Sequence, residues 1–179
     1  MQELVVCSIT AAMKYDIPAN IMLAVAEKEG GKPGQWKRNT NGTNDVGPMQ
    51  FNTAYLTELA RYGITPDDVA APGCYSFDLA SWRLKNHIRN DQGDVWTRAA
   101  NYHSRTYQYN TTYRADLIKK ANKWGNWLEG QLATYDVQAP GQPPAMVKEK
   151  PFTTAMAVQQ PIKMESNYVP RKITVSGEP

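Results

Sequence analysis

The chain has 179 residues, a formal net charge of +3 at pH 7 and no run of Lys or Arg. The length suits one domain with an appendage, and the small, dispersed charge gives no indication of nucleic-acid binding. No stretch of 18 apolar residues is present, so the sequence predicts no membrane-spanning helix. The first residues lack a basic segment followed by a long apolar one, so we expect no signal peptide within them.

Two helices are predicted at the start of the chain. The first covers residues 3–15, and its apolar positions recur on one side: Leu4, Val5, Ile9, Ala12 and Met13. Pro18 suits the first position of the second helix, where a missing N–H is tolerated. Gly30-Gly31 suits the end of that helix, because glycine is common just past a helix C-terminus.

The second helix carries a carboxylate on its apolar face. Ile21, Met22 and Val25 share this face with Glu29, whereas Glu27 lies roughly 200° around the helix axis from it. A carboxylate held against apolar surface has its charged form disfavoured, so its pKa rises. The pattern therefore favours Glu29 as an acid still protonated near neutral pH. The alternative is a solvated glutamate in the last turn of a helix.

Residues 31–52 are rich in Gly, Asn and Pro, which predicts a loop or a short hairpin. Asn41-Gly42 is a strong turn signal. Asn and Gln side chains both donate and accept hydrogen bonds, as sugar hydroxyl and N-acetyl groups require. Gly47 would let the backbone approach a ligand closely. A sugar-binding loop is thus one interpretation, and an Asn/Gly-rich connector without a ligand is the other.

Four further helices are predicted, over residues 53–62, 77–90, 95–103 and 112–130. The first three have candidate caps at Thr53, Ser76 and Asp94. The fourth has a buried stripe of Tyr113, Leu117, Ala121, Trp124 and Leu128. An exposed aromatic loop is expected before it, in which Tyr107 and Tyr109 either stack on sugar rings or cover the core. His87 is interpreted as structural, because no metal partner is visible beside it.

The composition changes near residue 134. The remaining stretch is Pro-rich and polar and has no periodicity, which predicts an extended tail or linker. We therefore expect a compact domain over residues 1–133 and a tail over 134–179. The tail is either disordered or docked on a partner through its few large apolar side chains: Phe152, Ile162, Met164 and Tyr168.

Several segments together resemble one known family. AVAEKEGG, then NTNGTNDVGPMQFN, then AANYHSRT are similar to the lytic transglycosylases of goose-lysozyme-like fold. The similarity is strongest to the small branch that accompanies type IV secretion, conjugation and type IV pilus systems, and it covers most of residues 5–130. The loop positions that match the family are Asn39, Asn41, Gly42, Asp45, Gly47, Met49, Gln50 and Asn52. Gly30 stands where the family has Ser, and Pro48 where it usually has Leu.

This resemblance implies a fold and a chemistry. The fold would be mainly α, a lysozyme-like helical domain with at most a small β-hairpin near residues 35–51. Glu29 would be the single acid and base that cleaves the bond between N-acetylmuramic acid and N-acetylglucosamine, leaving a 1,6-anhydro product without cofactor or metal. The substrate-binding residues implied are Asn39, Asn41, Gly47, Met49, Gln50, Asn52, Tyr102, His103 and Tyr113. The partners implied are the peptidoglycan strand and, through the tail, components of a secretion, conjugation or pilus machine.

Two other functions stay open at this point. Glycosidases normally use two carboxylates, and Asp45 is a possible second one, although Asp is also favoured in turns for backbone reasons. A muramidase on the same fold would deliver water in place of the muramyl C6 hydroxyl. A non-catalytic factor that binds wall glycan is the third possibility, since Gly30 removes a hydroxyl near the acid.

The two cysteines, Cys7 and Cys74, are either buried thiols or one disulfide. The resembled family often joins its first helix to the segment after the substrate loop in this way, which implies the bridge. It would close a loop of roughly 70 residues and stabilise the fold by about 3–4 kcal/mol in the chain-entropy picture. It would also imply an oxidising compartment such as the periplasm.

Overall fold

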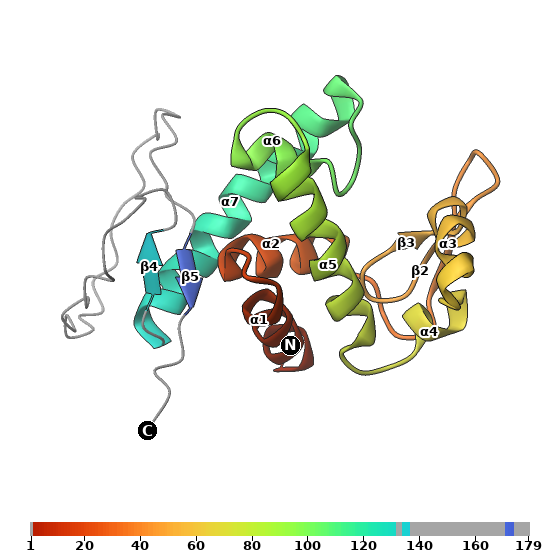
Figure 1. Ribbon diagram of the computed structural model, residues 1–179, viewed down its shortest axis with the longest axis horizontal. Helices are drawn as coiled ribbons and strands as arrows, with labels where there is room; N and C mark the ends of the chain where they lie inside the picture. The colour runs from red at the N-terminus through yellow and green to blue at the C-terminus, as the bar shows by residue number, and fades with distance from the viewer. Residues whose placement is uncertain (1, 132–133, 137–170, 174–179) are drawn as a thin grey trace, which may run out of the picture.

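The computed structural model describes residues 2–131, 134–136 and 171–173. Four longer helices and a small sheet make up most of this part, with the sheet and two short helices on one side of α5 (Figure 1). The helices are α1 (Gln2–Tyr15), α2 (Ala19–Glu29), α3 (Thr53–Leu59), α4 (Pro66–Ala70), α5 (Tyr75–Asn90), α6 (Val95–Ala100) and α7 (Tyr107–Gln131), with a 3-10 turn η1 (Ala60–Tyr62). The strands are β1 (Trp36–Arg38), β2 (Asn44–Val46), β3 (Phe51–Asn52), β4 (Thr134–Asp136) and β5 (Arg171–Ile173). The predicted mainly α fold is confirmed.

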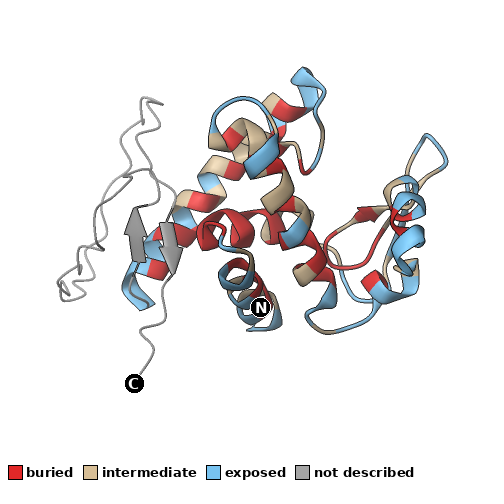
Figure 2. Ribbon diagram, viewed as in Figure 1, coloured by how far each residue is buried: buried red, intermediate tan, exposed pale blue. Residues whose placement is uncertain are grey.

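The core is built around α2. Every residue from Ala19 to Ala26 is at most 1% exposed, and α1 and α7 pack against the helix from different sides (Figure 2). The single apolar face predicted from the sequence is therefore too narrow, because a helix surrounded by others is buried all round. Pro18 is the N-cap of α2 and not its first residue. Gly30 ends the helix as predicted, in the left-handed region at φ 56°, and its N–H donates to the Ala26 carbonyl.

The loop after α2 forms a three-stranded antiparallel sheet in the order β1-β2-β3. Trp36 pairs with Val46 in the first hairpin, and Val46 pairs with Phe51 in the second. The predicted turn at Asn41-Gly42 joins β1 to β2, with Gly42 at φ 85°. The third strand was not predicted, because two residues are too few to show a periodicity.

Two helix starts differ from the prediction. Asn52, and not Thr53, caps α3, since its side chain accepts the Ala54 N–H at 3.0 Å. The Thr53 hydroxyl instead accepts the Asn44 N–H across the sheet at 3.0 Å. At α5 the N-cap is Cys74, and the predicted cap Ser76 is fully buried inside the helix.

Three other element bounds also differ. The segment predicted as a turn before Cys74 contains the short helix α4, whose capping box joins Thr65 and Asp68. Asp94 caps α6 as predicted, but the helix ends at Ala100 and not at residue 103. The predicted aromatic loop begins α7, since the helix starts at Tyr107. There Asn110 is buried and its N–H donates to the Thr106 carbonyl at 2.8 Å.

The disulfide between Cys7 and Cys74 is present, which confirms the pairing that the family resemblance implied. The two Cα atoms are 5.0 Å apart and the residues are 67 positions apart in the chain. The bridge joins α1 to the N-cap of α5. Beside it the Glu3 carboxylate accepts the Gly73 N–H at 2.7 Å, so the same two segments are joined twice.

The stretch after α7 is only partly described. β4 pairs antiparallel with β5, and β5 lies beside α2. No strand was predicted in this Pro-rich stretch. The four apolar residues proposed as docking points, Phe152, Ile162, Met164 and Tyr168, lie outside the described residues, and the boundary at residue 133 stays a prediction. In the described part of the chain, none of the helices combines the length and the apolar character that a bilayer crossing requires.

Candidate active site

Glu29 lies at the C-terminal end of α2, between the sheet and α7. Its Oε1 accepts a hydrogen bond from the Tyr113 hydroxyl at 2.7 Å. The pKa of the Glu29 carboxyl is raised to about 7: burial is the main cause and the nearby Asp45 charge adds to it, whereas Tyr113, Arg83 and Lys28 act in the opposite direction. About half of this carboxyl is protonated at neutral pH, which suits a group that gives up a proton and takes one back.

Glu27 lies on another face of α2, and its pKa is shifted in the opposite direction to that of Glu29. It accepts hydrogen bonds from Lys123 and, at 2.6 Å, from the Trp124 indole. Burial alone would raise the pKa of Glu27, but these two donors and the Lys120 charge hold it below the ordinary value. Glu27 is therefore an ionised structural residue, and the surroundings shift the pKa values of these two carboxyls, two positions apart, in opposite directions.

Tyr113 is held in place by its neighbours. The His103 ring stacks on the Tyr113 ring with 4.8 Å between centroids and 6° between planes. The Lys28 ammonium lies 5.1 Å from the Tyr113 centroid and is itself bonded to Asp116 at 2.6 Å. Burial raises the pKa of the Tyr113 hydroxyl well above its ordinary value, so the hydroxyl keeps its proton and donates a hydrogen bond to Glu29. Two predicted site residues, Tyr113 and His103, are thus brought to the acid.

Tyr102 and Met49 were predicted as separate substrate-binding residues, but they form one internal contact. The Tyr102 hydroxyl donates to the Met49 carbonyl at 3.0 Å. The Tyr102 ring is buried and meets Phe51 edge-on at 6.5 Å between centroids. The Met49 side chain has no exposed surface. Tyr102 therefore holds the loop before β3 in place, and the Met49 side chain packs in the core where a ligand does not reach it.

Packing alone is enough to require glycine at position 47. It is buried with φ 70°, and a Cβ at this position would clash with the Val69 carbonyl at the end of α4. Gly31 has a comparable role that the sequence did not reveal, where it was interpreted only as a helix terminator. A Cβ on Gly31 would clash with the Gly47 carbonyl, and the Gly31 N–H donates to the Pro48 carbonyl at 3.1 Å. The end of α2 therefore lies directly against the loop.

The asparagine side chains of the loop bond to other residues of the same loop. Thr43, which the sequence analysis did not single out, is their common partner: its hydroxyl accepts from Asn39 at 3.2 Å and from Asn52 at 2.9 Å, and donates to Asn41 at 2.7 Å. The Asn52 amide also donates to Asp45 at 2.9 Å. These contacts fix the shape of the loop.

Gln50 stands out in the same loop, because it holds a left-handed conformation at φ 50°, which is uncommon for a residue with a side chain. Its amide donates to the Gly47 carbonyl at 2.8 Å. Backbone strain of this kind persists where the surroundings enforce it and is frequent at functional sites.

Two hollows meet at Glu29. The larger, of about 610 Å³, lies toward the loop, and the smaller, of about 380 Å³, lies along the start of α7. Both are lined by Lys28, Glu29, His103 and Tyr109. Of the predicted site residues, the larger hollow also contains Asn39, Asn41, Gln50, Asn52 and Tyr102, the smaller contains Tyr113, and Gly47 and Met49 line neither. An elongated ligand that fills both hollows would pass over the carboxyl.

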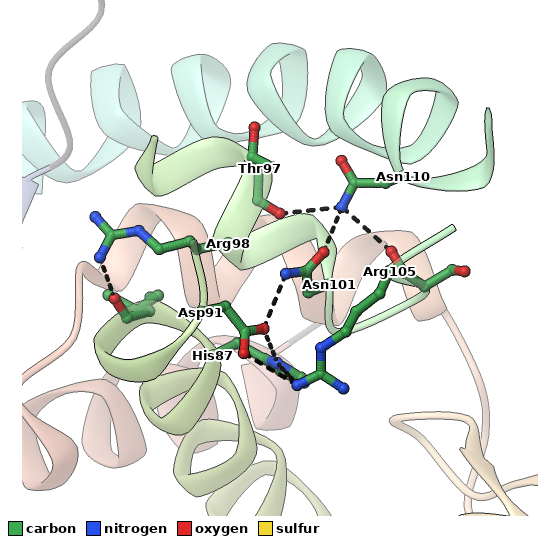
Figure 3. Close-up of polar contacts among 9 residues, drawn as sticks. His87, Asp91, Thr97, Arg98, Asn101, Arg105 and Asn110 are labelled. Carbon is green, nitrogen blue, oxygen red and sulfur yellow. Dashed lines mark hydrogen bonds and ion pairs between the residues drawn. The ribbon is translucent and has the colours of Figure 1, made fainter. Parts of the chain in front are cut away.

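A polar network supports the turn that carries Tyr102 and His103 (Figure 3). Asp91, at the end of α5, accepts from Asn101 at 2.8 Å and from Arg105 at 3.0 Å, and contacts the His87 imidazole at 2.7 Å. The Asn110 amide bonds to Asn101 at 2.7 Å and to two backbone carbonyls of the same region. Although burial opposes it, the three donors lower the pKa of Asp91 to about 2. His87 thus makes structural contacts, as its sequence context suggested.

Comparison with known proteins places these features in a family. Residues 6–124 match the family described as "Transglycosylase SLT domain". Invasion protein IagB of Salmonella typhimurium (strain SL1344) is 26% identical over 130 residues, which span 71% of this chain and 79% of that protein. Protein IpgF of Shigella flexneri is 30% identical over 101 residues, which span 56% of this chain and 66% of that protein.

Proposed function

Because the chain belongs to the SLT transglycosylase family, we propose that it is a lytic transglycosylase that cleaves the β-1,4 bond between N-acetylmuramic acid and N-acetylglucosamine. The observation that carries the proposal is the position of Glu29. A carboxyl whose pKa is raised to about 7 lies where two hollows meet, and Tyr113 donates a hydrogen bond to it. A glycan strand filling both hollows would present its bonds to this acid.

Glu29 serves in two steps. The protonated carboxyl first donates its proton to the glycosidic oxygen, and the bond to the muramyl C1 breaks. The C6 hydroxyl of the same sugar then attacks C1, and the Glu29 carboxylate accepts the hydroxyl proton. The product is a 1,6-anhydro sugar, no water is consumed, and the acid returns to its starting state. The Tyr113 hydroxyl favours the carboxylate that exists between the two steps.

Gly30 is compatible with this assignment, although it stands where the family has a serine. It adopts a left-handed conformation that L side chains rarely hold, and it lies just after the acid on the exposed side of α2. Its role is to end the helix, so the acid keeps its position without a neighbouring hydroxyl. A glycan-binding factor without activity has no corresponding need for a buried carboxyl whose pKa is raised to about 7.

The proposed setting is the periplasm, where the enzyme opens the wall locally for a secretion, conjugation or pilus apparatus. The Cys7–Cys74 disulfide favours an oxidising compartment, and one relative is named an invasion protein. In this proposal residues 1–133 form the catalytic domain, and the stretch from 134 to 179 contacts the apparatus.

Digestion of purified sacculi, with products read by mass spectrometry, tests the proposed reaction. We expect muropeptides that end in 1,6-anhydro-N-acetylmuramic acid. Products heavier by one water, with a reducing end, would identify a muramidase with the same acid. Sacculi that are bound but yield no product would identify a glycan-binding factor.

A further inference from the structure

Arg83 is a charged residue that lines the larger hollow and has no step assigned to it in the reaction above. It lies in the middle of α5 and is half-buried. Its guanidinium is 4.2 Å from the centroid of the Tyr55 ring and 4.7 Å from that of the Tyr102 ring. Two aromatic faces therefore hold the guanidinium group in place, although neither of them neutralises its charge.

Among the described residues Arg83 has no ion pair or hydrogen bond, whereas two other cations near the site, Lys28 and Arg105, have carboxylate partners. Lys28 is bonded to Asp116, and Arg105 is bonded to Asp91. The Arg83 charge lowers the pKa of Glu29, but no carboxylate of the described residues is bonded to it. A half-buried guanidinium that is fixed in place in this way is suited to bond to a carboxylate of a ligand. Its planar pair of N–H groups matches a carboxylate.

Arg83 lines both the larger hollow and a third one of about 420 Å³. One face of α5 lines this third hollow, since Arg83, Asn86, His87 and Asn90 follow each other at helical spacing. The two asparagine amides offer donors and acceptors of the kind that peptide groups need. Tyr55, Glu58, Asp91 and Arg105 complete the lining.

A branched ligand fits this arrangement better than a linear one. The two hollows that meet at Glu29 have room for the glycan backbone, and the third shares Arg83 with the larger of them but is not lined by Glu29. Muramyl residues carry a lactyl group that bears the stem peptide, and this substituent contains carboxylates. We propose that Arg83 binds a carboxylate of the stem peptide on the muramyl residue in the larger hollow, and that the third hollow receives the rest of that peptide. The proposal rests on the glycan substrate proposed above.

Binding measurements in the Glu29→Gln background test this without cleavage. Three soluble probes are compared by calorimetry: peptide-bearing glycan strands, strands stripped by an amidase so that the lactyl carboxylate is free, and neutral chitooligosaccharide. Arg83→Gln should weaken binding of the peptide-bearing strands about tenfold, as loss of one charge-assisted contact does. It should leave chitooligosaccharide binding unchanged. Arg89→Gln, an exposed arginine on the same helix, is the matched control and should change neither.

Two other outcomes would count against the proposal. A loss confined to the stripped strands would place the contact at the lactyl carboxylate and remove the peptide from the third hollow. An equal loss of affinity for all three probes would show that Arg83 only holds the Tyr55 and Tyr102 rings in place. In that case Arg83→Lys, which keeps the positive charge beside the rings, should restore binding of all three probes. If wild type does not cleave sacculi but the pattern above holds, the carboxylate site stands and the transglycosylase proposal falls.

Discussion

Glu29→Gln should lower the rate of glycan cleavage at least about 1,000-fold while leaving the fold and glycan affinity intact. The amide has nearly the same shape and can still accept the Tyr113 hydrogen bond. It can neither donate a proton to the glycosidic oxygen nor take one from the C6 hydroxyl, so both steps lose their proton carrier. The rate is measured as release of soluble muropeptides, and affinity as co-sedimentation with sacculi.

Glu27→Gln is the matched control, because it makes the same chemical change two residues away. Glu27 contacts Lys123 and Trp124 on the other side of α2, so this variant should lose some stability and retain activity. Residual activity of Glu29→Gln above one tenth of wild type, or an equal loss in Glu27→Gln, would be incompatible with Glu29 as the acid.

The same substitution should also change the pH dependence of stability. The folded protein holds the Glu29 proton more tightly than the unfolded chain does, because the folded pKa is raised from 4.5 to about 7. The contribution of Glu29 to the free energy of unfolding of the wild type is therefore fully present below pH 4.5 and is lost as the pH rises through 7. Glu29→Gln has no such loss, so its stability relative to wild type should increase between pH 5 and pH 8, by at most ~3 kcal/mol.

Removal of the disulfide is expected to have the largest effect on stability. Cys7→Ser combined with Cys74→Ser should lower the free energy of unfolding by about 3–4 kcal/mol, since the bridge restricts a long loop in the unfolded chain. That corresponds to a fall in Tm of roughly 10 °C for a domain of this size. Urea unfolding followed by far-UV circular dichroism measures it, with m-values compared to detect compaction of the denatured state.

Reduction of the wild type by a thiol reagent is the matched control, because it opens the same bond without changing a residue. The reduced wild type and the double variant should unfold at similar urea concentrations, and both should retain cleavage below their transitions, since neither cysteine lines the hollows at Glu29. A change below 1 kcal/mol in both would mean that the Glu3–Gly73 hydrogen bond and the packing of α1 on α5 already restrict the loop.

The sequence predicted the parts of the fold that depend on local pattern. Helix positions followed from apolar spacing, and the end of α2 from Gly30-Gly31. What it missed depends on contacts between distant segments. Asn52 caps α3 in place of Thr53 because Thr53 is bonded to Asn44 across the sheet. The start of α7 at Tyr107 follows from a buried Asn110 that bonds to Asn101, a residue on a different element.

In the candidate site, too, local pattern predicted some features, and contacts between distant segments determine the others. The position of Glu29 on an apolar face was readable from one helix, and its raised pKa agrees with that interpretation. Motif positions alone could not separate residues that line the hollows from those that shape the loop. Met49 and Gly47 are buried residues of the loop, and the Tyr102 hydroxyl is bonded to the Met49 carbonyl. Arg83 carried no sequence signal, since an arginine within a helix usually faces solvent.

The protonation of Glu29 is the central claim, and a direct titration of this carboxyl tests it. Wild-type and Glu29→Gln proteins labelled with ¹³C at the glutamate carboxyl are followed by NMR from pH 3 to pH 9, and the resonance absent from the variant is assigned to Glu29. The account predicts a pKa of about 7 for that resonance. A pKa at or below the ordinary 4.5 would mean that Glu29 is ionised throughout the working range, and the assignment of this residue as the acid would be contradicted.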